Sequence, residues 1–239
     1  MNANQPPRPA NMRSIVAINQ GLRPLTLEEP SCATLSPEEA QNLLSQDHLL
    51  LDTRSPEAFG AGHIAGALNV QLSSSEFEQR AGWMLPEEGG VVIVAETREA
   101  ARQAIRKLAF VGLDQRIRGQ VEWGAWKDAG LPTGTLGQIT VDELSAELAR
   151  GEIKVLDVRE PSEWRGGHVS SALHMNFKHL AQRIGELPLE REDRVAVICA
   201  TGMRSSTACS VLLRNGFRSL FNVTGGMAAW MKAGHSVTP

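Results

Sequence analysis

Several features are missing from this 239-residue sequence, and each absence excludes a class of protein. No apolar run approaches the roughly 18 residues that a membrane-spanning helix needs. The first ten residues, M-N-A-N-Q-P-P-R-P-A, hold no apolar core of a secretory signal, so we expect none. The 3 cysteines, Cys32, Cys199 and Cys209, include no C-x-x-C pair, which indicates free thiols in a reducing, cytoplasmic setting.

The sequence also lacks the residue spacing that is typical of metal sites. The 6 histidines are scattered, and His174 and His179 have no partners at metal-ligand spacing. We therefore expect no metal and no cofactor. The composition, with 42% hydrophobic and 21% charged residues, is that of an ordinary globular protein. We expect neither nucleic acid nor a membrane among its partners.

An internal repeat organises the chain. The segment D-T-R-S-P-E-A-F-G-A-G-H-I-A-G-A-L-N from Asp52 aligns with D-V-R-E-P-S-E-W-R-G-G-H-V-S-S-A-L-H from Asp157, and Trp126 aligns with Trp230. The repeat predicts four parts: a Pro-rich leader (1–30), a first copy (31–132), a Gly-rich linker (133–138) and a second copy (139–239).

Each copy alternates short apolar runs with helical stretches, which predicts an α/β fold with an open, mostly parallel sheet and helices on both faces. Strands are expected at 153–157 and 194–199, with weaker signals at 171–175 and 220–223. Helices are expected at 141–149, 177–186, 205–215 and 226–233. Ligands of such sheets bind at the carboxyl ends of the strands, which is where Cys199 stands.

The stretch from Arg194 to Ser206, R-V-A-V-I-C-A-T-G-M-R-S-S, is the chemically distinctive part of the chain. A lone cysteine at the end of an apolar strand is usually a buried packing residue. Here Gly202 permits a sharp turn, Arg204 adds a positive charge, and the run Ser205–Thr207 is expected to cap a helix. Backbone N–H groups of such a loop and helix start would favour a thiolate at Cys199.

The loop C-A-T-G-M-R-S, Cys199 to Ser205, resembles the active-site loop of the rhodanese superfamily of sulfurtransferases, and Asp157 to Ala172 resembles the same family's upstream motif. The family often has glycine at the position of Ser171 and proline after the region of Asn176. The resemblance implies two tandem rhodanese-like domains and sulfur transfer through a Cys199 persulfide. The expected binding residues are Ala200, Thr201, Gly202, Met203, Arg204 and Ser205.

The implied reaction moves a sulfane sulfur from thiosulfate or a low-molecular-weight persulfide to cyanide, glutathione or a protein thiol. Two rival functions stay open. A relay or binding module would pass the persulfide only to a protein partner. A Cdc25-like phosphatase is disfavoured, because such enzymes have five residues between Cys and Arg and this loop has four, 200–203.

The first copy lacks the cysteine and the loop residues that sulfur transfer would need. Ala95 aligns with Cys199, Arg98 with Gly202 and Ala100 with Arg204, and Glu96 and Glu99 would repel an anion. We therefore expect the first copy to be a degenerate structural domain without sulfurtransferase activity.

Residues that recur in both copies are expected to be structural. These are Asp157 and Arg159 (Asp52 and Arg54), His168 (His63) and Trp230 (Trp126). Glu163 and Trp164 have no such twins and are candidates for lining the pocket. Cys32 and Cys209 are expected to be structural.

The leader segment P-A-N-M-R-S-I-V-A-I-N-Q-G, residues 9–21, resembles the segment that joins the catalytic domain of persulfide dioxygenases to fused rhodanese domains. We expect the leader to pack partly on the body of the protein and a persulfide-handling protein to be a candidate partner. The sequence has no H-x-H-x-D-H motif, so we expect no dioxygenase activity from this chain.

Overall fold

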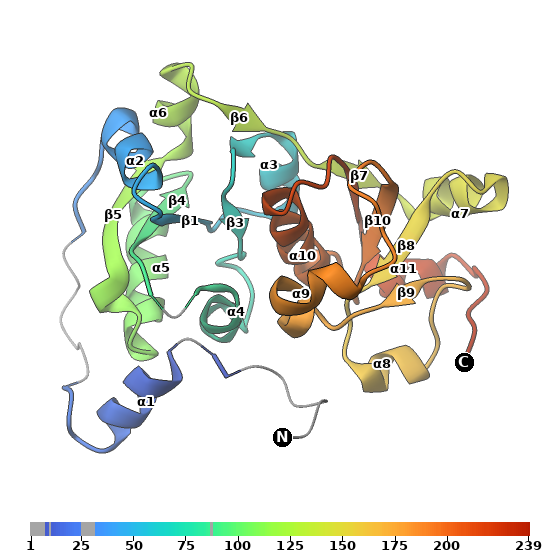
Figure 1. Ribbon diagram of the computed structural model, residues 1–239, viewed down its shortest axis with the longest axis horizontal. Helices are drawn as coiled ribbons and strands as arrows, with labels where there is room; N and C mark the ends of the chain where they lie inside the picture. The colour runs from blue at the N-terminus through green and yellow to red at the C-terminus, as the bar shows by residue number, and fades with distance from the viewer. Residues whose placement is uncertain (1–7, 10, 25–31, 87) are drawn as a thin grey trace. The chain divides into compact units, whose positions relative to one another are not determined.

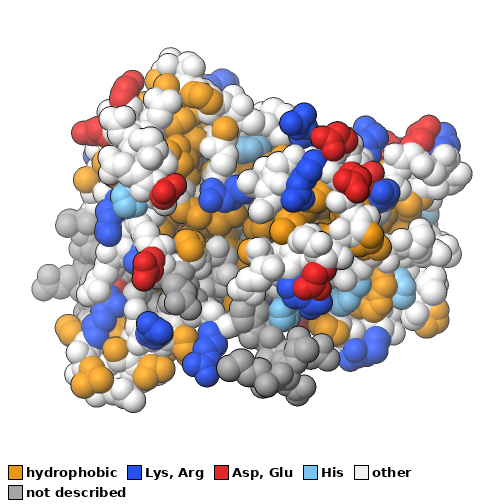
Figure 2. Space-filling view, in the orientation of Figure 1, with side chains coloured by type: hydrophobic (Ala, Val, Ile, Leu, Met, Phe, Trp, Pro, Cys, Tyr) orange, Lys and Arg blue, Asp and Glu red, His pale blue; other side chains and the backbone are white. Residues whose placement is uncertain are grey.

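The computed structural model describes residues 8–9, 11–24, 32–86 and 88–239. The chain forms two compact units, one from Met1–Ser55 and His63–Gly134, the other from Pro56–Gly62 and Thr135–Pro239 (Figure 1). On the face seen in Figure 2, acidic and basic side chains are interspersed, so neighbouring charges of opposite sign partly cancel each other's field.

Unit 1 is built on a parallel sheet with the strand order β3-β1-β4-β5. A short antiparallel pair, β2 with β6, joins residues 63–64 to residues 133–134. The strands are β1 (Leu49–Asp52), β2 (His63–Ile64), β3 (Leu68–Asn69), β4 (Val91–Ala95), β5 (Ile117–Glu122) and β6 (Thr133–Gly134). The helices are α1 (Met12–Asn19), α2 (Pro37–Leu44), α4 (Phe77–Met84), α5 (Arg98–Phe110), the short η1 (Asp114–Arg116) and α6 (Trp123–Asp128).

Unit 2 has five parallel strands in the order β7-β11-β10-β8-β9. The strands are β7 (Gly137–Ile139), β8 (Lys154–Asp157), β9 (Leu173–His174), β10 (Arg194–Ile198) and β11 (Ser219–Val223). The helices are α3 (Pro56–Ala61), α7 (Val141–Arg150), α8 (Pro161–Arg165), α9 (Phe177–Arg183), the short η2 (Ile184–Glu186), α10 (Met203–Arg214) and α11 (Gly226–Lys232).

Helices cover both faces of the unit 2 sheet because its central strand is apolar on both sides. Ala196 and Ile198 of β10 belong to a buried cluster with residues of α7 and α11, including Trp230. Val195 and Val197 alternate with them and are fully buried as well. Helices α9 and α10 pack together, and α10 also packs on β10 and β11. The predicted open, mostly parallel α/β sheet is confirmed in both units.

The predicted elements of the second copy are all present, with ends shifted by a few residues. The structure adds β7 and α8, which the sequence patterns missed because each is only 3 to 5 residues long. The predicted linker 133–138 contributes β6 to unit 1 and the start of β7 to unit 2. Helix α3 comes from the first sequence copy and belongs to unit 2.

The leader contacts unit 1 through α1 and its flanks. The Asn11 side-chain N–H donates to the Val111 carbonyl at 3.1 Å, and Arg23 donates to the Gly112 carbonyl at 2.9 Å. The predicted packing of the leader on the body is thereby confirmed for the residues described. The rest of the predicted leader, at 1–7, 10 and 25–30, lies outside the described residues.

The residues that recur in both copies make the same contacts twice. Arg159 donates through its guanidinium to both carboxylate oxygens of Asp157, whose Oδ1 also accepts from the Arg159 backbone N–H at 3.0 Å. Arg54 and Asp52 repeat this arrangement in unit 1. These contacts confirm the predicted structural role of the Asp and Arg pairs.

The two recurring tryptophans also make equivalent contacts. Trp126 and Trp230 are buried, and each indole N–H donates to a carbonyl six residues later, that of Pro132 or Ser236. The predicted core role of both tryptophans is confirmed.

Ser171 adopts a left-handed backbone conformation, with φ of +64°, at the position where the family often has glycine. Left-handed φ costs a residue with a Cβ roughly 1–2 kcal/mol, which glycine avoids. We expect Ser171→Gly to raise Tm by about 2 °C, after allowing for the extra freedom of glycine in the unfolded chain. Thermal unfolding followed by circular dichroism would measure this. Ser170→Gly is the control and should lower Tm, and a lower Tm for Ser171→Gly would contradict the argument.

Candidate functional site

Cys199 follows the central strand β10 directly and is 1% exposed. The chain turns over residues 200–202, and Gly202 takes φ of +100°, a conformation that glycine adopts without strain. This turn brings the Gly202 N–H to 3.2 Å from the Cys199 sulfur. The Ser205 hydroxyl oxygen lies 3.4 Å from the same sulfur. The thiol therefore lies inside the loop, among hydrogen-bonding groups.

The expectation that Ser205–Thr207 cap the following helix is wrong. Helix α10 begins at Met203, Gly202 occupies the N-cap, and Ser205, Ser206 and Thr207 are buried inside the helix. The left-handed turn at Gly202 lets the helix start two residues earlier than the Ser/Thr pattern indicates. The backbone N–H groups in the first turn of a helix have no acceptor within the helix. In α10 these groups begin at Met203, four residues after Cys199. Ser205 therefore does not cap α10, and its hydroxyl faces the Cys199 sulfur.

The N-terminal turn of α11 forms backbone hydrogen bonds with the cysteine loop. The Met227 N–H donates to the Cys199 carbonyl at 2.8 Å, and the Ala228 N–H donates to the Ala200 carbonyl at 3.0 Å. Gly226 passes so close to the loop that a Cβ on it would lie 2.3 Å from the Cys199 carbonyl oxygen. Because these two loop carbonyls accept hydrogen bonds from α11, the orientation of their peptide groups is fixed.

Arg204 is paired with a carboxylate. Its guanidinium donates to both oxygens of Glu163 at 2.7 Å, which ties the first turn of α10 to α8. The hydrogen bonds from Arg204 hold the pKa of the Glu163 carboxyl below its usual range. Glu163 also accepts from the Glu160 backbone N–H at 3.0 Å. Glu163, a predicted pocket-lining candidate, is thus the ion-pair partner of Arg204.

Trp164, the other pocket-lining candidate, lies between two histidines. Its ring stacks on His168 with 3.5 Å between centroids and on His174 with 4.7 Å. The His168 backbone pairs with Thr238 in both directions at 2.9 Å. These contacts place His168 in the packing around α8, consistent with the structural role predicted for it.

The corresponding loop of unit 1 is an ordinary helix start. Strand β4 ends at Ala95, and Thr97 caps α5 by accepting from the Ala100 N–H at 3.2 Å. Thr97 has φ of −138°, so the left-handed turn made by Gly202 in unit 2 is replaced by extended backbone. Glu96 pairs with Arg54 at 3.4 Å. This loop carries no thiol and ends in a side-chain cap.

The other two cysteines are poor nucleophiles at neutral pH. Burial raises the pKa of the Cys32 thiol to about 11. Burial, with a smaller contribution from nearby Cys199, raises the pKa of the Cys209 thiol still further. All three cysteines are free thiols.

Sequence patterns missed two residues that are linked to the site by hydrogen bonds. Asn222, 1% exposed at the end of β11, accepts from the Ser205 hydroxyl at 2.6 Å, and Gln138 of β7 accepts from the Asn222 amide at 3.1 Å. A polar residue near the carboxyl end of a strand, before Gly225-Gly226, is the one signal that could have indicated Asn222.

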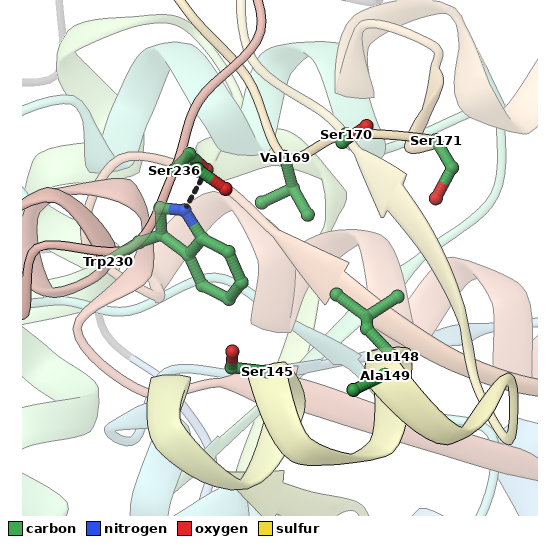
Figure 3. Close-up of a pocket in the computed structure, with 8 residues that line it drawn as sticks. All are labelled: Ser145, Leu148, Ala149, Val169, Ser170, Ser171, Trp230 and Ser236. Carbon is green, nitrogen blue, oxygen red and sulfur yellow. Dashed lines mark hydrogen bonds between the residues drawn. The ribbon is translucent and has the colours of Figure 1, made fainter.

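A separate pocket of about 270 Å³ opens elsewhere in unit 2. Figure 3 shows it between α7, the 169–171 segment and the C-terminal part of the chain, with the Trp230 indole bonded to the Ser236 carbonyl. Its lining residues are Ser145, Leu148, Ala149, Val169, Ser170, Ser171, Trp230 and Ser236. None of these belongs to the Cys199 loop.

Within residues 8–9, 11–24, 32–86 and 88–239, no three His, Cys, Asp or Glu side chains gather in a way that could hold a metal ion. In the same ranges, no helix has the length and apolar character required to cross a bilayer.

Unit 2 is thus an open parallel α/β domain with a cysteine loop at the carboxyl end of its central strand, and unit 1 repeats the fold without the cysteine. The rhodanese-like domain family matches residues 36–120 and 140–233. These segments make up most of the chain, which therefore belongs to the rhodanese-like domain family. The match begins after the leader, so the likeness of residues 9–21 to a dioxygenase fusion segment stays a prediction.

Two individual relatives each match about two fifths of the chain. A sulfurtransferase from Allochromatium vinosum is 32% identical over 100 residues, which are 41% of this chain and 92% of that protein. The thiosulfate sulfurtransferase GlpE from Shewanella oneidensis is 27% identical over 95 residues, 40% of this chain and 92% of that protein.

Two solved structures also resemble parts of this chain. A rhodanese-related protein from Thermoplasma volcanium is 31% identical and covers 43% of this chain and 97% of its own, with a TM-score of 0.39. A thiosulfate sulfurtransferase from Pseudomonas aeruginosa is 21% identical and covers 86% of this chain and 43% of its own, with a TM-score of 0.40.

The close approach of Gly226 to the cysteine loop predicts a severe effect of Gly226→Ala. The added Cβ would collide with the Cys199 carbonyl, and φ of +55° is itself unfavourable for alanine. We expect Tm to fall by about 5–10 °C. Gly234→Ala is the matched control, because Gly234 has φ of +78° with open space around it and should lower Tm by only about 2–4 °C. Equal losses for the two variants would show that the approach to the loop is unimportant.

The Arg204–Glu163 pair predicts a pH-dependent contribution to stability. Because the pKa of Glu163 is lowered in the folded protein, its contribution is present above the ordinary value of 4.5 and is lost as pH falls through the lowered value. We therefore expect Glu163→Gln to lower Tm at pH about 7 and to match the wild type at pH about 3. Glu186→Gln, which breaks an exposed pair with Arg183, should change Tm little at either pH. A Tm difference for Glu163→Gln that grows toward acid would contradict this.

Proposed function

We propose that the protein is a sulfurtransferase that moves a sulfane sulfur from thiosulfate or a low-molecular-weight persulfide to a thiophilic acceptor through a persulfide on Cys199. The single observation that carries the proposal is the position of the Cys199 sulfur. It lies at the carboxyl end of the central strand, 3.2 Å from the Gly202 N–H, in front of the first turn of α10. A sulfur anion in that place is held by backbone dipoles and needs no metal.

The reaction has two steps that balance without a net oxidant or reductant. The Cys199 thiolate attacks the outer sulfur of thiosulfate, an S–S bond forms, and sulfite leaves with the electron pair of the broken bond. Cyanide, glutathione or a protein thiol then attacks the outer sulfur of the persulfide, and the Cys199 thiolate leaves. The proposed binding residues are Ala200, Thr201, Gly202, Met203, Arg204 and Ser205, mainly through their backbone N–H groups.

For Arg204 we propose a positioning role. Its guanidinium is engaged by both oxygens of Glu163, so its charge is offset and its direction is fixed. This arrangement also weakens the phosphatase alternative, which would need the arginine to face a bound phosphate. We infer that Arg204 keeps the first turn of α10 in place while the backbone contacts the substrate sulfur.

For the first copy we propose a structural role, because its loop ends in a Thr97 cap where the second copy has a cysteine and a left-handed glycine. The free thiols also support the proposed cytoplasmic location. A persulfide-handling protein is also proposed as a sulfur acceptor in the cell.

The intact mass of the reduced protein after incubation with thiosulfate tests the proposal. We expect the wild type to gain one sulfur atom, which cyanide should remove, because in this proposal the Cys199 loop stabilises the sulfur anion. Cys199→Ser should gain none. Cys209→Ser is the matched control and should load like the wild type, because the buried Cys209 thiol has a raised pKa.

Other outcomes have defined meanings. If thiosulfate fails to load Cys199, glutathione persulfide is the next donor, and failure of both would exclude the sulfurtransferase. Loading followed by discharge only to a protein thiol, with no release to cyanide or glutathione, would favour the relay.

A further inference from the structure

A chain of polar side chains runs across the unit 2 sheet to the Cys199 sulfur. Gln138 and Asn222 are register partners on the neighbouring strands β7 and β11, and the Asn222 amide donates to the Gln138 side-chain oxygen at 3.1 Å. The Ser205 hydroxyl donates to the Asn222 oxygen at 2.6 Å. Ser205 and Asn222 are both buried, so these bonds are made in a dry environment, where they are strong.

The direction of the hydrogen bonds is set at the far end of this chain. The Gln138 amide N–H faces the Leu136 backbone carbonyl at 3.5 Å, and a carbonyl can only accept. The Gln138 oxygen must then face Asn222, whose amide donates to it and whose own oxygen is left to accept from Ser205. A hydroxyl has one proton, so Ser205 offers the sulfur a lone pair when its proton is on Asn222. In this state Ser205 can accept an S–H from the thiol and donates no hydrogen bond to a thiolate.

The support of Gln138 comes from α3, a helix of the first sequence copy that belongs to unit 2. The Leu136 N–H donates to the Gly60 carbonyl at 3.1 Å. A Cβ on Gly60 would lie 2.4 Å from the Gln138 amide nitrogen and 3.0 Å from the Leu136 carbonyl oxygen. Glycine at this position therefore leaves just enough room for the Gln138 amide in the orientation described.

We propose that Gly60, Gln138 and Asn222 are positioning residues that keep the Ser205 proton away from the Cys199 sulfur and so control how readily this thiol ionises. The inference rests on the proposed role of Cys199 as the nucleophile. It gives α3 of the inactive copy a direct part in the chemistry of the active copy. When the Gln138–Asn222 pair is disturbed, the Ser205 proton turns to the sulfur and stabilises the thiolate.

The near-ultraviolet absorbance of the thiolate, titrated between pH about 5 and 9 in the full-length protein, tests this. Subtraction of a Cys199→Ala titration isolates Cys199, and the high pKa values of Cys32 and Cys209 keep their own signals small. We expect Gly60→Ala to move the Cys199 midpoint down by about 0.5 pH unit, a threefold change in ionisation constant, because the displaced Gln138 amide frees the Ser205 proton. Gln138→Met, on the edge strand β7, should produce the same shift without a steric clash.

The controls separate this effect from loss of fold. Gly124→Ala, also in a short helix but with open space around the glycine, should leave the midpoint unchanged. The ionisable pairs near the loop, Arg204 with Glu163 and Asp157 with Arg159, remain in every variant. The double variant of Gly60 and Gln138 should shift no further than either single one, since both act on the same bond.

An unchanged or raised midpoint in folded Gly60→Ala and Gln138→Met proteins would overturn the inference. The titration needs no sulfur donor, so its outcome is independent of whether thiosulfate loads Cys199. Loading in the mass experiment without a midpoint shift would leave the proposed function standing and remove only the role of the polar chain.

Discussion

The proposed site depends on one constraint, which is that the peptide groups of the cysteine loop must present their N–H sides to the sulfur. Peptide groups are free to rotate in an isolated loop, and a turn of only three residues has little packing of its own. Two backbone bonds from α11, to the Cys199 and Ala200 carbonyls, remove that freedom. The helix thus fixes the carbonyl sides of these two peptide groups, and in the proposed function the opposite N–H sides are left for a sulfur anion.

A comparison of the two units separates the requirements of the fold from those of the chemistry. Both units have the Asp–Arg ion pair at the end of a strand, β1 or β8. Both also have the buried tryptophan whose indole N–H donates to a carbonyl six residues later. They differ at the end of the central strand, where Thr97 caps a helix in extended backbone and Gly202 turns it in left-handed backbone. The scaffold is therefore independent of Cys199, and the candidate site lies in a few residues of the loop.

Much of this could be predicted from the sequence, because the relevant signals are local or repeated. Apolar runs located the strands, the repeat located the second copy, and the position of Cys199 after a buried strand indicated the candidate site. The start of α10 was misplaced, because the Ser/Thr run has the composition of a cap and the deciding feature is the backbone angle at Gly202. The Glu163–Arg204 pair and the bond from Ser205 to Asn222 join residues 41 and 17 positions apart, and no local pattern specifies such contacts.

The placement of α3 bears on why a copy without a nucleophile remains part of the chain. If the first copy were only a neighbouring scaffold, every one of its elements would pack with its own sheet. Instead, residues 56–62 leave that unit between β1 and β2 and pack in the unit that holds Cys199. The Gly60 carbonyl there accepts from the Leu136 N–H, and Gly60 limits the space of Gln138, which is two hydrogen bonds away from Ser205 of the cysteine loop. A short segment of the first sequence copy thus packs in the unit that holds Cys199, and this packing does not require the first copy to carry any chemistry.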